Sequence, residues 1–182
     1  ALLLGFAFAL FYVTVGLPMG LLADRVNRRR LLIAGILVWS LATFAGGLAR
    51  DFGELFASRL FIGIGEAVLA PCAVTLIADA FPAAARGRPM AVYVYGTMTA
   101  YGVGSLLSGY VLQLAPTGAF DAIPGLQGLA PWRIAFLFAG VTGLLVVALL
   151  LPLREPARQG AGATAGATPR SARITLEFFV ER

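Results

Sequence analysis

The sequence of 182 residues contains no histidine, no lysine and only one cysteine, Cys72. A single cysteine excludes a disulfide bond within the chain. Without histidine, zinc sites and the acid–base chemistry of imidazole are strongly disfavoured. Ser/His, Cys/His and paired-carboxylate constellations are also missing, so we do not expect an enzyme. Cys72 is most simply a small packing residue.

Charge is scarce as well, because only 13% of the residues are charged whereas 59% are hydrophobic. A soluble domain usually carries about 25% charged residues. The apolar residues form blocks that approach or exceed the roughly 20 residues a helix needs to cross a bilayer, and they lack the alternation of barrel strands. We therefore predict an all-α membrane protein, a polytopic bundle of five helices in the lipid bilayer. Residues 1–153 form this bundle, with spans at about 1–23, 31–49, 55–80, 89–115 and 132–152.

The basic residues are all arginines, and their positions predict the orientation of the bundle. They cluster between the first two blocks, between the third and fourth, and after the last, whereas the opposite loops hold only Arg50. The composition of residues 154–182 predicts a flexible linker or tail. The positive-inside rule places it in the cytoplasm, beside the inner membrane. The net charge of +5 is a topology signal, so we expect no nucleic-acid partner.

The first inner loop, Gly20-Leu-Leu-Ala-Asp-Arg-Val-Asn-Arg-Arg-Arg-Leu31, is the strongest motif. Two long helices joined by so few residues need a tight turn, and Asn27 tolerates the left-handed backbone that such turns often use. Asp24 and Arg28 stand four residues apart and can pair if the first helix continues that far. Four arginines alone would be only a topogenic cluster, but charge bias explains neither Gly20 nor Asp24.

This loop resembles the signature between the second and third helices of the major facilitator superfamily. The matching positions include Gly20, Asp24, Arg25, Arg28 and Arg29, whereas Val26 and Asn27 depart from the pattern. The strings around residues 59–67, 79–88, 131–133 and 154–156 are similar to later elements in family order. The chain thus resembles helices two to six of an N-terminal six-helix repeat, most like the Spinster-type or organic-anion branch.

The resemblance implies a secondary active transporter, a symporter or antiporter, that moves a small organic or amphipathic solute by alternating access. It implies no cofactor, with a proton gradient as the energy source. It also implies that the first helix and the C-terminal half of the same transporter are missing partners, so we expect a fragment. The alternative is a non-transporting membrane assembly subunit or the inactive product of a truncated transporter gene.

Glu66 lies near the middle of the third block, where a charge costs about 2.5–3.5 kcal/mol on insertion scales. Such residues usually face a cavity and serve ion pathways. Arg59 lies two turns earlier on the same helix face, roughly 10 Å away. We predict that Glu66 and Arg59 belong to a proton-coupling and substrate pathway, and the Spinster resemblance implies the same for Glu66. A structural hydrogen bond from Glu66 to a neighbouring helix is the alternative.

The resemblance further implies a cytoplasmic gate in which Asp24, Arg28 and Asp79 interact, within the motif that also includes Gly20, Arg25 and Arg29. For Asp79 alone, a solvated acid at a helix end is an equally open interpretation. The fourth block carries a stripe of small residues, which predicts close helix packing. Its members are Gly96, Ala100, Gly104 and Ser108.

Overall fold

The computed structural model describes the backbone of residues 2–157 and the side chains of residues 12–157. Within these residues every regular element is a helix. The α-helices are α1 (Leu2–Arg25), α2 (Arg28–Leu48), α3 (Phe52–Ala67), α4 (Leu69–Ala80), α5 (Gly87–Leu114) and α6 (Pro131–Leu150). Short 3-10 turns, η1 (Ala83–Ala85) and η2 (Ala115–Thr117), flank α5. The tail that we predicted at residues 154–182 lies, beyond residue 157, outside the described residues.

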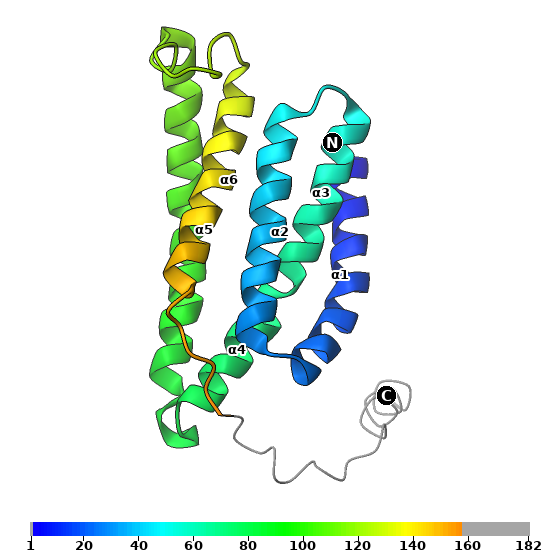
Figure 1. The fold of residues 1–182 in the computed structure, drawn as a ribbon, viewed down its shortest axis with the longest axis vertical. Helices are drawn as coiled ribbons and strands as arrows, with labels where there is room; N and C mark the ends of the chain where they lie inside the picture. Colours follow the sequence, from blue (N-terminus) through cyan, green and yellow to red (C-terminus); the bar gives the residue numbers. More distant parts are fainter. Residues whose placement is uncertain (1, 158–182) are drawn as a thin grey trace.

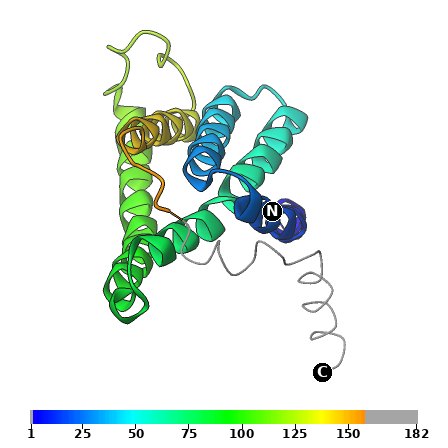
Figure 2. The same cartoon turned by 60° about the horizontal axis from the view of Figure 1, so that its bottom comes forward.

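The long helices run side by side, with α2 between α6 and α3 and with α1 packed on α3 (Figures 1 and 2). The two turns that carry arginines, between α1 and α2 and between α4 and α5, lie at the same end as the residues after α6 (Figure 1). We call this the arginine end. The connections before α3 and before α6 lie at the opposite end. The predicted fold class, an all-helical bundle, is confirmed.

Three helical stretches within the described residues are long and apolar enough to cross a membrane by length and composition: α2, Phe52–Ala80, and α6. The helix α5 is longer than α2, with 28 residues, but its glycines, serines, threonines and tyrosines lower its mean hydropathy. None of its residues is buried. It therefore packs against the other helices far less than α2 does.

The third predicted span is not one continuous helix, because α3 ends at Ala67 and α4 begins at Leu69. Pro71 explains the break: it has no N–H to donate to the Ala67 carbonyl, and its ring collides with that carbonyl. At the break, Val68 donates its N–H to the Glu66 carbonyl. The helix α4 consequently leaves α3 at an angle (Figure 1).

The turn between α1 and α2 also differs from our prediction. Asn27 has extended backbone angles, φ −66° and ψ 110°, rather than left-handed ones. It is the N-cap of α2, and its side-chain oxygen accepts a hydrogen bond from the Arg30 N–H at 2.8 Å. Asparagine is favoured at this position because the first N–H groups of a helix have no partner within it.

Close helix packing occurs on α2 rather than on the predicted stripe of α5. A Cβ atom added to Gly140 of α6 would lie 2.8 Å from the backbone nitrogen of Phe44 in α2. On the other side of α2, Gly65 of α3 faces Gly35. By contrast, a Cβ on Gly96 or Gly104 of α5 would meet no described atom within 4 Å. Glycine thus brings both neighbours of α2 into backbone contact with it.

The buried core gathers side chains from α1, α2, α4 and α6 in the half of the bundle toward the arginine end. Its centre is Cys72, a free cysteine that is 0% exposed. The other buried members are Ala23, Leu32, Ile36, Val68, Leu76 and Val147. This core supports the polar cluster described next.

Candidate functional site

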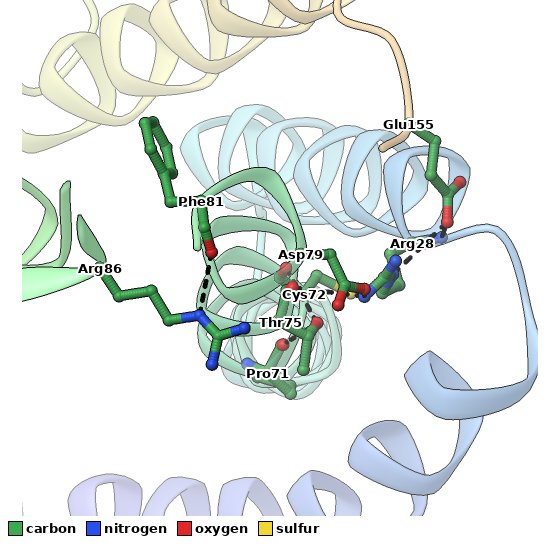
Figure 3. Close-up of polar contacts among 8 residues, drawn as sticks. All are labelled: Arg28, Pro71, Cys72, Thr75, Asp79, Phe81, Arg86 and Glu155. Atoms are coloured by element: carbon green, nitrogen blue, oxygen red, sulfur yellow. Dashed lines mark hydrogen bonds and ion pairs between the residues drawn. The ribbon is translucent and has the colours of Figure 1, made fainter. Parts of the chain in front are cut away.

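Arg28 is the first residue of α2, and it is only 4% exposed. Its NH1 atom forms an ion pair with Oδ2 of Asp79 at 2.5 Å, and its Nε atom forms a second one with Oε1 of Glu155 at 3.4 Å. The backbone N–H of Arg28 also donates to the same Glu155 oxygen at 3.1 Å. Figure 3 shows the arginine between the two carboxylates, which come from opposite sides. We call these three residues the Arg28 cluster.

The neighbouring backbone also stabilises the buried charge of Arg28, because NH1 donates to the Thr75 carbonyl at 3.3 Å. A buried charge is tolerated only when it is paired and hydrogen-bonded. The contact with Glu155 is the less complete of the two. Among the described atoms, NH2 of Arg28 and Oε2 of Glu155 are buried without hydrogen-bond partners. The Asp79 pair is therefore the stronger half of the cluster.

The structure brings together two of the three residues that we predicted for the gate. Arg28 and Asp79 are in contact, whereas Asp24 is exposed and contributes to neither ion pair of Arg28. The reason is that α1 ends at Arg25 and the chain turns before Arg28. The four-residue spacing of Asp24 and Arg28 therefore does not place them on one helix face, so the condition for their pairing along a continuous helix is not met.

The remaining residues of the motif have separate environments. Arg25 is exposed at the end of α1. Gly20 has room around it, since an added Cβ would meet no described atom within 4 Å. Arg29 reaches across to α6, where its NH2 donates to the Leu151 carbonyl. Only Arg28 of these residues belongs to the Arg28 cluster.

Sequence analysis did not assign Glu155 to the site. It lies just beyond α6, and 127 residues separate it from Arg28 along the chain. A signal was present, because the whole chain contains only nine acidic residues and Glu155 follows the end of an apolar block. That signal identifies an unusual residue but not its partner.

Glu66 lies near the end of α3, next to the break before α4, and is half-buried. Tyr12 of α1 lies within Coulombic range of Glu66 and of two further tyrosines, Tyr93 and Tyr101 of α5. Of these tyrosines, Tyr12 is the one that interacts with Glu66. Sequence reasoning assigned no role to it.

Arg59 is exposed on α3, and its guanidinium carbon lies 4.8 Å from the centre of the Phe136 ring in α6. A cation over an aromatic face is attracted by the negative charge density of the ring. Gly46 of α2 helps this approach, because a side chain at that position would collide with Ser58 and Phe136. The ion pairs of Arg28 with Asp79 and Glu155 involve neither Arg59 nor Glu66.

The described residues contain no group of three or more His, Cys, Asp or Glu that could hold a metal ion. What the arrangement supplies is a buried ion-pair cluster at one end and a half-buried carboxylate near a helix break. Together with the apolar helices, these features define a multi-pass helical membrane protein with charged groups inside the bundle. Such groups in membrane helices typically mark ion or substrate pathways.

The chain belongs to the Major Facilitator Superfamily, whose family model matches residues 1–182. It is 28% identical over 156 residues to the protein spinster of Drosophila melanogaster, covering 86% of this chain and 24% of that one. It is 33% identical over 139 residues to the probable L-galactonate transporter of Escherichia coli strain K12, covering 76% and 27%.

A solved structure shows the same fold. The crystal structure of a bacterial homolog to the human lysosomal transporter Spinster, inward-facing and unoccupied, matches with a TM-score of 0.66 and 32% identity. The match covers 84% of this chain and 34% of that one. The chain therefore spans about a quarter of the length of the two relatives and about a third of the solved structure. The predicted membership of the superfamily, of the Spinster type, is confirmed, and the relatives are transporters rather than enzymes.

Proposed function

We propose that this chain forms most of the N-terminal half of a proton-coupled secondary transporter for an organic anion, and that it works by alternating access. Family membership supports transport over a non-transporting assembly subunit or an inactive product. The single observation that carries the proposal beyond the family is the Arg28 cluster, in which a buried cation is paired with Asp79 of α4 and Glu155 after α6. Ion pairs that join separate helices at one end of a bundle suit a gate.

We assign the gate to the arginine end and place that end in the cytoplasm of the inner membrane, following the positive-inside rule. In this assignment Asp24, which is exposed near the end of α1, faces the second half of the transporter. That second half is the main protein partner, since substrate sites of this kind lie at the midplane between two repeats.

Glu66 and Arg59 form the proposed transport pathway. Glu66 carries the proton, because a half-buried carboxylate beside a helix break can change its protonation as its surroundings change. Arg59 supplies the positive charge that attracts an anion, and its exposed position on α3 leaves it accessible. The name of the E. coli relative specifies galactonate, a carboxylate, which supports an organic anion as the substrate class.

The test is uptake by proteoliposomes that contain the full-length transporter, with a proton gradient imposed in either direction. L-galactonate serves as the hydrophilic carboxylate and a lysophospholipid as the amphipathic phosphate. We expect a gradient to drive accumulation of at least one anion, and Arg59→Gln to raise its KM at least tenfold. Gradient-independent uptake that is indifferent to Arg59→Gln would rule out both the coupling and the anion site.

A further inference from the structure

The helices α2 and α6 run antiparallel, and an arginine near the start of each one binds a carbonyl at the end of the other. Arg29 is the second residue of α2, and its NH2 donates to the carbonyl of Leu151, the C-cap of α6. Arg133 is the third residue of α6, and its NH1 donates to the carbonyl of Gly47, in the last turn of α2, at 3.2 Å. The contacts are reciprocal, one at each end of the helix pair.

Helix electrostatics explain why arginine serves at both positions. A cation in the first turn of a helix is disfavoured by the dipole of that helix, but it is favoured beside the C-terminus of another. Neither α2 nor α6 has an acidic residue in its first turn to offset the charge. The last carbonyls of a helix also lack partners within it. In the antiparallel pair, each arginine therefore donates a hydrogen bond to a carbonyl that has no partner within the helix to which that carbonyl belongs.

Between the two arginine contacts, α2 and α6 pack too closely for one helix to slide along the other. The contact between α2 and α6 is the most extensive one between any two described helices. A Cβ on Gly140 would lie 2.9 Å from Cα of Phe44, and one on Gly47 would lie 3.0 Å from the Arg133 carbonyl oxygen. A shift along the common axis by one turn, about 5.4 Å, would break both arginine contacts together.

We infer that Arg29 and Arg133 are positioning residues that clamp α2 and α6 into one rigid unit, the frame against which the rest of this half moves. The contact of Arg29 with Leu151 lies next to Arg28 in the chain. It therefore also fixes the cation of the Arg28 cluster relative to the end of α6. The movement of α4, which carries Asp79, then changes the ion pair while Arg28 stays in place. The term gate rests on the proposed function, but the rigidity of the frame does not.

Distances between spin labels test this directly in the full-length protein, after its native cysteines, including Cys72, are replaced. Labels at Leu48, the last residue of α2, and Ala139, midway along α6, report the half of the pair away from the arginine end, which we call the outer end. Labels at Ala34 and Leu149 report the arginine end; all four residues are exposed. The unmodified pair should give one narrow distance distribution at each end.

Arg133→Gln should at least double the width of the outer distribution and leave the inner one unchanged, and Arg29→Gln should do the reverse. Arg133→Lys, which keeps a charged donor, should restore part of the narrow distribution. Arg30→Gln is the matched control, because Arg30 is exposed in the same turn of α2; it should change neither end. If Arg133→Gln does not fold, the Arg29 and Lys variants still provide the comparison.

The clamp is wrong if the glutamine variants leave their own ends unchanged, or if each of them widens both ends equally, as general loosening would. The measurement needs neither substrate nor a proton gradient. Suppose that uptake fails but each glutamine variant widens the distance distribution at its own end only. That result would count against the proposed transport function and not against the rigid unit of α2 and α6.

Discussion

Gly65 of α3 and Gly35 of α2 face each other so closely that a Cβ on Gly65 would lie 2.5 Å from the Gly35 carbonyl oxygen. Because both contacting groups are backbone, Gly65→Ala must push α3 away from α2. Overpacking of this kind costs about 1–3 kcal/mol. We expect a clearly lower melting temperature of the purified full-length protein. Gly96→Ala on α5, where an added Cβ meets no described atom, is the control. Equal melting of the two variants would contradict the packing.

Asp79→Asn should be the most damaging change in the Arg28 cluster. It leaves Arg28, which is only 4% exposed, without its stronger ionic partner, and breaking a buried pair costs ~3–5 kcal/mol. Glu155→Gln should cost less, because its contact with Nε is longer, 3.4 Å, and an amide oxygen still accepts hydrogen bonds. Chemical unfolding of both variants gives the comparison. The reverse order would make Glu155 the main partner.

Asp24→Asn should separate a gating role from a structural one. Asp24 is exposed, and substitutions on the surface usually alter stability by less than about 0.5 kcal/mol. Turnover should nevertheless fall while substrate affinity is kept, since the gate lies half a membrane from the site. A large loss of affinity at normal turnover would place Asp24 in the binding site instead.

Glu66→Gln should uncouple transport from the proton gradient. Glutamine keeps the size and hydrogen bonding of the protonated acid but cannot release a proton. The variant should fold, bind substrate and exchange it across the membrane without concentrating it. Substrate accumulation in proteoliposomes, with and without an imposed gradient, measures this. Glu54→Gln, at an exposed helix start, is the control. Unchanged gradient dependence in Glu66→Gln would favour a structural role.

Reporter fusions test the proposed orientation. A fusion at Gly162, after α6, should show cytoplasmic activity, and one at Ala119, in the long loop between α5 and α6, should show periplasmic activity. The physical reason is the retention of arginine-rich segments on the cytoplasmic side. Periplasmic activity at Gly162 would reverse the topology and move the Arg28 cluster to the outer face.

The apolar blocks were sufficient to predict the helices, because a bilayer demands long runs of one kind of residue. The ends of the helices and the break at Val68 were harder to predict. Asn27 is compatible with either a left-handed turn or an N-cap, and only the capping bond to Arg30 distinguishes them. Pro71 was visible in the sequence, yet proline inside a membrane helix can be accommodated by neighbours, so its effect depends on packing.

Only those residues of the candidate site that belong to a local sequence motif could be predicted. The motif identified Arg28, and family order suggested Asp79, but Glu155 joins them from a segment 127 residues away along the chain. Which arginine is buried also could not be deduced from four adjacent charges. Burial depends on how α2 packs against α4 and α6, and the close approach of α6 involves contacts such as Gly140 with Phe44.

The break at Val68 has a consequence for the order of events in a transport cycle. Glu66 is on α3 and Asp79 is on α4, so the two carboxylates belong to different rigid pieces joined by one residue. A tilt of α4 alone would separate Asp79 from Arg28 while leaving Glu66 in place on α3. If Glu66 carries the proton as proposed, its protonation and the opening of the arginine end would then be successive steps with an intermediate between them, rather than one concerted movement.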